Sequence, residues 1–123
     1  MGRPVHFEIL GDDPGKLAEF YSNVLGWEFQ SWSGSEEFQV DYHLATTGPK
    51  DQPGIDGAIM KRHFPQPVIN TTLVDSLEET LAKVAAAGGK LVFGPNEIPY
   101  VGTHAYCEDP EGNLFGVIEE PKA

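Results

Sequence analysis

Two residues capable of proton chemistry lie near the start of the chain. His6 and Glu8 belong to the stretch VHFEI, in which apolar and polar residues alternate. This alternation predicts a β-strand over residues 5–9 with His6 and Glu8 on one face. A neutral imidazole can move a proton without a metal, and a neighbouring carboxylate can orient it or bind a cation. His6 is therefore a candidate ligand-contacting or acid–base residue, with Glu8 beside it. An inert hydrogen-bonded histidine and a solvated glutamate are the structural alternatives.

A glycine interrupts the last predicted strand. The chain closes with DPEGNLFGVIEE, a turn followed by a strand with Gly116 in its interior. A glycine inside a strand often marks a place where a ligand or another backbone approaches closely. Gly116 is therefore a candidate for the wall of a binding site.

His104 and Tyr106 precede this turn, and the length of the turn decides which way they face. A four-residue turn over residues 109–112 would place Thr103, Ala105 and Cys107 on the face of Gly116. His104 and Tyr106 would then point to the opposite face. A different loop length would reverse this assignment.

Several other reactive residue types have ordinary structural interpretations. We expect His43 and His63 to be exposed, because they lie beside turn or connector residues. Tyr42 alternates with apolar neighbours, so we expect it to pack in the core. Cys107 is interpreted as a small buried apolar residue, since free cysteine is commonly buried.

The composition excludes several classes of function. The 123 residues carry a formal net charge of −11 and are 40% hydrophobic, which predicts a globular domain that repels nucleic acid and anionic membranes. The single cysteine excludes an internal disulfide and favours a reducing, cytoplasmic location. No signal-peptide core, dinucleotide-binding glycine motif, phosphate-binding loop, serine-hydrolase motif or CxxC pair is present.

Two helices are predicted from capping signals and apolar spacing. The first begins after Asp13, with Pro14 at its first position, and ends at Gly26. The second begins after Ser76, has Glu79 at the capping-box position and ends in a glycine pair. Strands with turn-forming residues between them fill the rest of the chain.

The elements repeat after 64 residues, so each half reads as strand, helix and three strands. We predict one α+β domain over residues 1–123, with pseudo-repeats 1–63 and 67–123. The modules would form a curved mixed sheet around a cleft, with the helices outside. The polar alternates of the two leading strands would line the cleft, which is an ordinary shape for a small-molecule site. These residues are His6, Glu8, Asn70 and Thr72.

The order of elements carries a resemblance to a known superfamily. The relevant stretches are HFEI at 6–9, DPGKLAEFYSNVLGW at 13–27 and DPEGNLFGVIE at 109–119. Together they resemble the vicinal oxygen chelate superfamily, which includes glyoxalases, extradiol dioxygenases and bleomycin- or fosfomycin-resistance proteins, and within it a glyoxalase-like subgroup. The resemblance covers essentially the whole chain.

This resemblance implies a test for a metal site. In the metal enzymes of the superfamily, His or Glu/Gln residues from the first and last strands of each half hold a divalent ion. His6 matches the first position, and Gly116 stands where Glu is usual. The first strand of the second half offers Ile69 or Asn70, and the last strand of the first half offers Gly57 or its neighbours, with Asp56 as the one carboxylate. About three protein ligands are needed, so we expect no complete metal site and no cofactor.

Two classes of function remain. We favour a binding protein that holds a small molecule in the cleft without transforming it. The alternatives are a metal-dependent lyase, isomerase or dioxygenase using His6, and a metal-free acid–base enzyme using His6 and Glu8. The resemblance also implies a homodimer.

Overall fold

The computed structural model describes residues 2–34, 39–98 and 101–121, and the chain divides into two compact units. The first unit is His6–Ile69, and the second combines Met1–Val5 with Asn70–Ala123. In chain order the elements are β1 (Arg3–Gly11), α1 (Pro14–Leu25), β2 (Glu28–Gly34), β3 (Gln39–Thr46), β4 (Gly57–Lys61), β5 (Val68–Leu73), α2 (Leu77–Ala86), β6 (Lys90–Ile98), β7 (Gly102–Glu108) and β8 (Leu114–Glu119).

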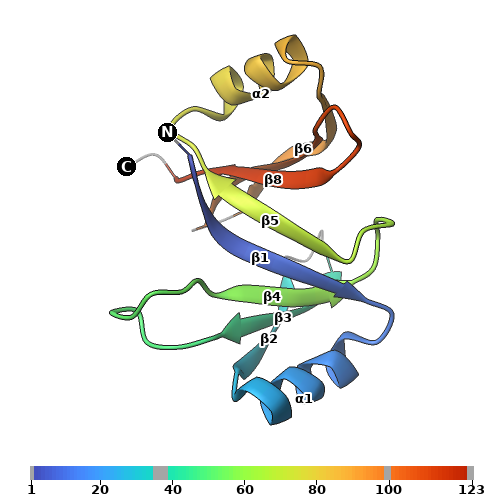
Figure 1. The fold of residues 1–123 in the computed structure, drawn as a ribbon, viewed down its shortest axis with the longest axis vertical. Coiled ribbons are helices and arrows are strands. Elements are labelled where there is room, and N and C mark those ends of the chain that lie inside the picture. Colours follow the sequence, from blue (N-terminus) through green and yellow to red (C-terminus); the bar gives the residue numbers. More distant parts are fainter. Residues whose placement is uncertain (1, 35–38, 99–100, 122–123) are drawn as a thin grey trace. The chain divides into compact units, whose positions relative to one another are not determined.

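This order confirms the predicted α+β class and the duplicated strand–helix–three-strand module (Figure 1). The grouping into one domain stays a prediction. In the part of the chain that is described, no helix combines the length and the apolar character needed to cross a membrane.

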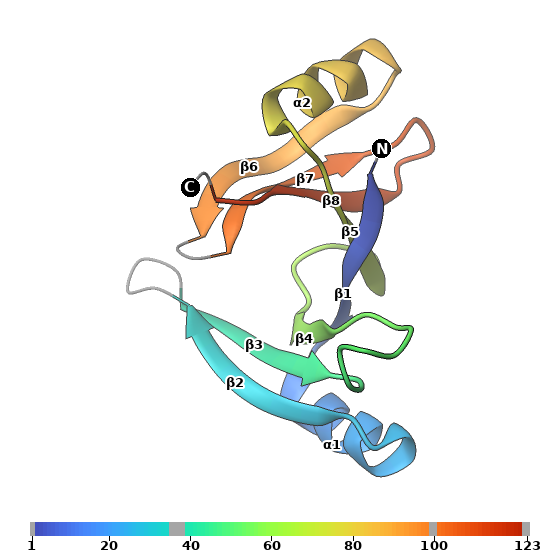
Figure 2. The same ribbon diagram turned by 90° about the vertical axis from the view of Figure 1, so that its left-hand side faces the viewer.

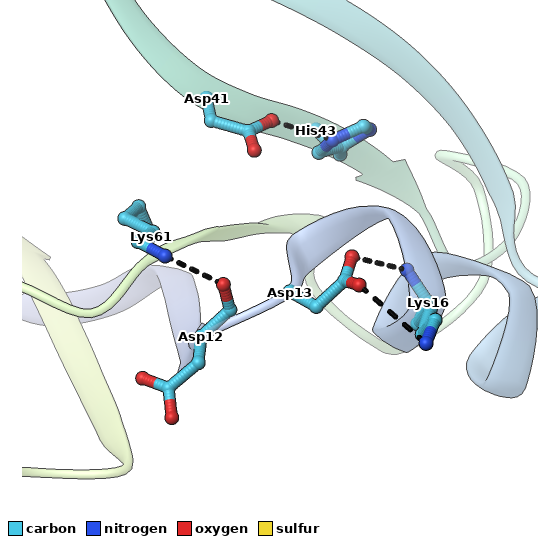
Figure 3. A network of polar contacts seen from close by, with 6 residues as sticks. All are labelled: Asp12, Asp13, Lys16, Asp41, His43 and Lys61. Carbon is cyan, nitrogen blue, oxygen red and sulfur yellow. Dashed lines mark hydrogen bonds and ion pairs between the residues drawn. The ribbon is translucent and has the colours of Figure 1, made fainter.

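Helix α1 begins and ends where its capping residues predict. The side chain of Asp13 accepts a hydrogen bond of 3.2 Å from the backbone N–H of Lys16, as Figure 3 shows, and Pro14 takes the first helical position. Gly26 ends the helix in the left-handed conformation, with φ of 73°, and its N–H donates to the carbonyl of Ser22. Glycine is favoured there because it carries no Cβ.

Helix α2 also begins at its predicted capping residue. The hydroxyl of Ser76 accepts a hydrogen bond of 3.2 Å from the N–H of Glu79, which confirms the predicted cap. Glu78 and Glu79 lie in the first turn, where negative charge is favourable toward the helix dipole.

The sheet of the first unit has the strand order β2-β3-β4-β1. Strands β1 and β4 are parallel, and the other neighbours are antiparallel. Helix α1 lies against one face of this sheet (Figure 2). On that face Phe7 contacts Trp27 at a ring distance of 5.4 Å, and Trp27 stacks on Tyr21 at 5.0 Å. Because side chains alternate along a strand, the neighbours His6 and Glu8 lie on the face that the helix does not cover.

The sheet of the second unit has the strand order β5-β8-β7-β6, and α2 covers one face (Figure 2). A buried cluster of Leu77, Ala105, Cys107 and Val117 forms under the helix, with Val74, Leu81, Val84 and Phe115 packed against it. Cys107 is fully buried, as predicted, and burial raises the pKa of its thiol.

The prediction for His104 and Tyr106 is wrong because the loop between β7 and β8 has five residues. Glu108 pairs with Leu114, so the loop spans residues 109–113 and Tyr106 pairs with Gly116. Tyr106 and His104 therefore share the face of Gly116, while the buried Ala105 faces α2.

Asp109 sets this loop length. Its Oδ1 atom accepts 2.9 Å hydrogen bonds from the N–H groups of Glu111 and Asn113, and its own N–H donates to the carbonyl of Asn113. These bonds close the loop around Asn113, one residue later than the assumed turn.

The predicted faces of β5 are also wrong. Thr71 pairs with Gly116, and Thr72 pairs with Val117, which belongs to the cluster under α2. Thr71 therefore shares the uncovered face with Gly116, whereas Thr72, and by alternation Asn70, lie on the helix side. The residue of β1 facing α1 is Phe7, so the repeat distance here is 65 residues, and a shift of one residue exchanges the two faces.

Candidate functional site

Three side chains of the first unit form one hydrogen-bonded network. The hydroxyl of Tyr42 donates to Oε2 of Glu8 at 2.8 Å, and its oxygen lies 2.9 Å from Nε2 of His6. A phenol has a single proton, which goes to Glu8, so Nε2 of His6 must carry the hydrogen that bonds the phenol oxygen. In the neutral imidazole, Nδ1 then has the free lone pair and can accept a hydrogen bond.

The strand register explains how these residues meet. Glu8 on β1, Ala58 on β4 and Leu44 on β3 are in register across three neighbouring strands. Tyr42 lies two residues from Leu44 and therefore shares its face. The small side chain of Ala58 leaves room for the tyrosine of β3 to reach β1, and Trp32 packs edge-on against the Tyr42 ring at 5.6 Å.

Burial sets the electrostatics of this network. Glu8 is 4% exposed, and its carboxylate is hydrogen-bonded, as a buried charge requires. Burial lowers the pKa of His6, and the charges of Glu8 and Asp56 partly oppose this effect. His6 is therefore a neutral base near pH 7.

A hollow of about 400 Å³ lies on this part of the first unit. Its lining consists of His6, Glu28, Phe29, Gln30, Leu44, Ala45, Thr46, Asp56 and Gly57. Asp56 is held in place by Thr47, whose N–H donates to Oδ1 at 2.9 Å. His6 therefore connects the hydrogen-bonded network to a space large enough for a small organic molecule.

In the second unit the space beside Gly116 is filled. A Cβ atom at Gly116 would meet the Thr71 hydroxyl oxygen, and Nε2 of His104 would lie 2.7 Å from it. Thr71 and His104 are themselves 3.4 Å apart, and the His104 ring packs edge-on against Tyr106 at 4.5 Å. Two polar side chains thus occupy the place of the missing side chain.

The five predicted site residues divide between the two units of the chain. His6 and Glu8 are brought together, whereas Asn70, Thr72 and Gly116 lie in the second unit. Whether any of these five residues binds a ligand stays a prediction.

Two residues of the first unit take positions that the sequence did not predict. Tyr42 was expected to pack in the core, but its hydroxyl bridges His6 and Glu8. Asp56 had an uncertain register; the pair Phe7–Gly57 places it next to His6 across the parallel strands. No local signal identifies either residue, because both assignments depend on strand pairing.

The remaining histidines lie elsewhere. His63 is exposed, as predicted. His43 is more buried than expected, with 19% of its side chain exposed, and its Nε2 lies 2.9 Å from the carboxylate of Asp41 (Figure 3).

The donor set does not fit the metal centre that the resemblance implies. Among residues 2–34, 39–98 and 101–121, no three His, Cys, Asp or Glu side chains gather in a metal-binding arrangement. At the two pairs of strand positions that the superfamily uses, the first unit offers His6 and Asp56, and the second offers Thr71 and Gly116. A hydroxyl and a glycine are poor substitutes for imidazole or carboxylate ligands.

Comparison with known proteins establishes the family. Residues 3–117 match the family model described as the Glyoxalase/Bleomycin resistance protein/Dioxygenase superfamily. The chain belongs to this superfamily. Structural likeness agrees: methylmalonyl-CoA epimerase from Mycobacterium tuberculosis superposes with a TM-score of 0.71 at 13% identity, covering 97% of this chain and 88% of that protein. At this identity the likeness shows the fold.

Two relatives are similar in sequence. CFP32 of Mycobacterium tuberculosis, named as a glyoxylase, is 31% identical over 115 residues. The alignment covers 91% of this chain and 42% of CFP32. This chain therefore spans less than half the length of CFP32. A Vibrio parahaemolyticus protein, named as a lactoylglutathione lyase, is 25% identical over 133 residues, covering 99% of this chain and 94% of that protein.

Proposed function

We propose that this protein binds a small organic molecule in the hollow of its first unit, without a metal ion as the anchor. The observation that supports the proposal is that His6, which is hydrogen-bonded to Tyr42 and through it linked to Glu8, lines that hollow. Glu8 and Tyr42 hold His6 in one orientation, which lowers the conformational entropy that the His6 side chain would lose on binding a ligand. The proposal also includes a homodimer, from the resemblance, and a cytoplasmic location, from the single cysteine.

The chemistry of the lining supports a binding role. Leu44 supplies apolar side-chain surface, and His6, Gln30 and Thr46 supply groups that can hydrogen-bond a ligand. Small-molecule sites usually combine apolar surface with a few placed polar groups. A solved methylmalonyl-CoA epimerase structure contains methylmalonyl-CoA, so this fold can hold a small molecule.

A ligand screen followed through His6 tests the proposal. Small molecules are screened by thermal shift, and a ligand at 100 times its Kd stabilises the wild type by about 2.7 kcal/mol. We expect His6→Gln to remove most of the shift while changing the melting temperature of the unliganded protein less. His63→Gln is the matched control, because His63 is exposed outside the hollow. An unchanged ligand shift in His6→Gln, together with a large loss of melting temperature, would mean that His6 is structural.

A metal-free acid–base enzyme is a second candidate. The link from His6 through the Tyr42 hydroxyl to Glu8 favours it, because a neutral imidazole can accept a proton while the carboxylate stabilises the imidazolium. The test is to incubate each screening hit with the protein in deuterated water. Exchange of a carbon-bound hydrogen that is lost in His6→Gln supports the enzyme. Hits recovered without exchange or chemical change support the binding protein alone.

A further inference from the structure

The hollow of the first unit has carboxylates in its lining and no positively charged side chain. Glu28 and Asp56 line it, and none of its lining residues is Lys or Arg. Among residues 2–34, 39–98 and 101–121, neither carboxylate forms an ion pair with Lys or Arg. Their charge is therefore left to act on whatever occupies the hollow.

Of the four Lys and Arg residues of the first unit, Lys16, Lys61 and Arg62 are engaged elsewhere, and Lys50 is exposed and does not line the hollow. The ammonium group of Lys61 donates to the backbone carbonyl of Asp12 at 2.7 Å, and Lys16 forms an ion pair with Asp13 at the start of α1 (Figure 3). Arg62 donates to the carbonyl of Leu10 at 3.0 Å. None of these three cations lines the hollow.

The imidazole in the lining does not compensate for the two carboxylates. Burial keeps His6 neutral near pH 7, and its Nε2–H is used by Tyr42, so Nδ1 can only accept. The lining groups that can only accept a hydrogen bond are therefore Nδ1 of His6 and the carboxylates of Glu28 and Asp56, whereas Gln30 and Thr46 can both accept and donate. The whole chain adds a net charge of −11, which acts in the same direction.

We propose that the hollow of the first unit selects cationic molecules, in which an ammonium or amidinium group adjoins an apolar portion, and rejects anions. This specificity rests on the proposed binding function and adds the class of ligand to it. An ammonium group supplies three donors to the acceptors of the lining, while the apolar portion covers Leu44, which lies on the same face as His6.

The charges of Glu28 and Asp56 disfavour binding of the ligands that the names of the similar proteins suggest. A coenzyme A ester carries several phosphate charges, and a glutathione conjugate has a net negative charge. Either would bring anionic groups toward Glu28 and Asp56 with no Lys or Arg in the lining to receive them. The shared fold therefore does not carry the specificity of these relatives to this chain.

Three probes of similar shape and different charge test the proposal: phenethylammonium, 3-phenylpropanamide and 3-phenylpropionate. Each is titrated into the full chain, and the ring signals of His6, assigned with His6→Gln, report binding by nuclear magnetic resonance. Methylmalonyl-CoA is the fourth probe. We expect the ammonium probe to bind about tenfold more tightly than the carboxylate, with the amide between them. The preference should shrink as salt is raised from 20 to 300 mM, because screening weakens exposed charges.

Charge-neutralising variants locate the effect. Glu28→Gln combined with Asp56→Asn should reduce the preference to about twofold or less. Asn at position 56 keeps an oxygen acceptor for the Thr47 N–H, so the loop contact is preserved. Glu111→Gln, in the exposed loop of the second unit, is the matched control and should leave the preference intact.

The outcomes separate this proposal from the function on which it rests. Equal or tighter binding of the carboxylate or of methylmalonyl-CoA overturns the charge selection and leaves small-molecule binding in place. A preference that survives in the double variant also overturns it. If no probe shifts the His6 signals, both proposals fail.

Discussion

Nε2 of His6 lies 2.9 Å from the hydroxyl oxygen of Tyr42, a residue 36 positions further along the chain. The same hydroxyl donates to Glu8, so one tyrosine ties both proton-active residues of β1 to β3. A buried carboxylate and an imidazole thus share one phenol as a hydrogen-bond partner. The contribution of this phenol can be measured.

Replacing Tyr42 with Phe should destabilise the protein by about 1–3 kcal/mol. The change removes the hydroxyl and leaves the carboxylate of Glu8, which is 4% exposed, without that donor. Urea denaturation measures the difference. Tyr21→Phe is the control, because Tyr21 is also partly buried and stacks on Trp27 through its ring. Its change should stay within about 0.5 kcal/mol. Equal effects of the two substitutions would contradict a structural role for the Tyr42 hydroxyl.

Stability should depend on pH through His6. Burial lowers the pKa of folded His6, so the unfolded chain binds more protons when pH is near or below the unfolded pKa of about 6.5. The stabilisation is fully present above the unfolded pKa and is lost as pH falls through the folded pKa.

Denaturation of wild type and His6→Gln from pH 8 to pH 5 checks this sign. The wild type should lose more stability than the variant on acidification. A variant that follows the wild-type curve at every pH would show that His6 does not titrate in this way. His63→Gln, at an exposed position, should reproduce the wild-type curve.

A side chain at position 116 should be destabilising. The Cβ atom of Gly116→Ala would meet the Thr71 hydroxyl oxygen and Nε2 of His104, so we expect a cost of about 1–3 kcal/mol for overpacking. Gly48→Ala is the control, because nothing lies within 4 Å of a Cβ there. Chemical denaturation compares the two. A neutral Gly116→Ala would mean that Thr71 and His104 move aside at little cost.

Metal removal should leave the protein unchanged. The first unit offers His6 and Asp56 at the superfamily's ligand positions, which is short of the three protein ligands that a catalytic zinc site uses. We expect protein purified without a histidine tag to contain far less than one divalent metal per chain, and its melting temperature to be insensitive to EDTA. Elemental analysis and thermal denaturation measure these properties. Stoichiometric zinc, nickel, manganese or iron, or a drop in melting temperature with EDTA, would favour the metal-dependent alternative.

The features that could be predicted from the sequence are local ones. Asp13 and Ser76 cap their helices because a short polar side chain reaches a backbone N–H three residues later, whatever the rest of the fold does. His6 and Glu8 share a face because the chain alternates along a strand. The duplicated module and the superfamily follow from motifs that are continuous in the chain.

Tertiary structure decided which residues meet across strands. Tyr42 reaches His6 and Glu8 only through the register of β3, β4 and β1, and Asp56 joins them by the same register. One extra loop residue, set by the hydrogen bonds of Asp109, turned His104 toward Gly116. The physical reason is that a strand has a period of two, so a slip of one residue exchanges its faces. Neither the composition nor the alternation of residues along the chain predicts which pairing register the strands adopt.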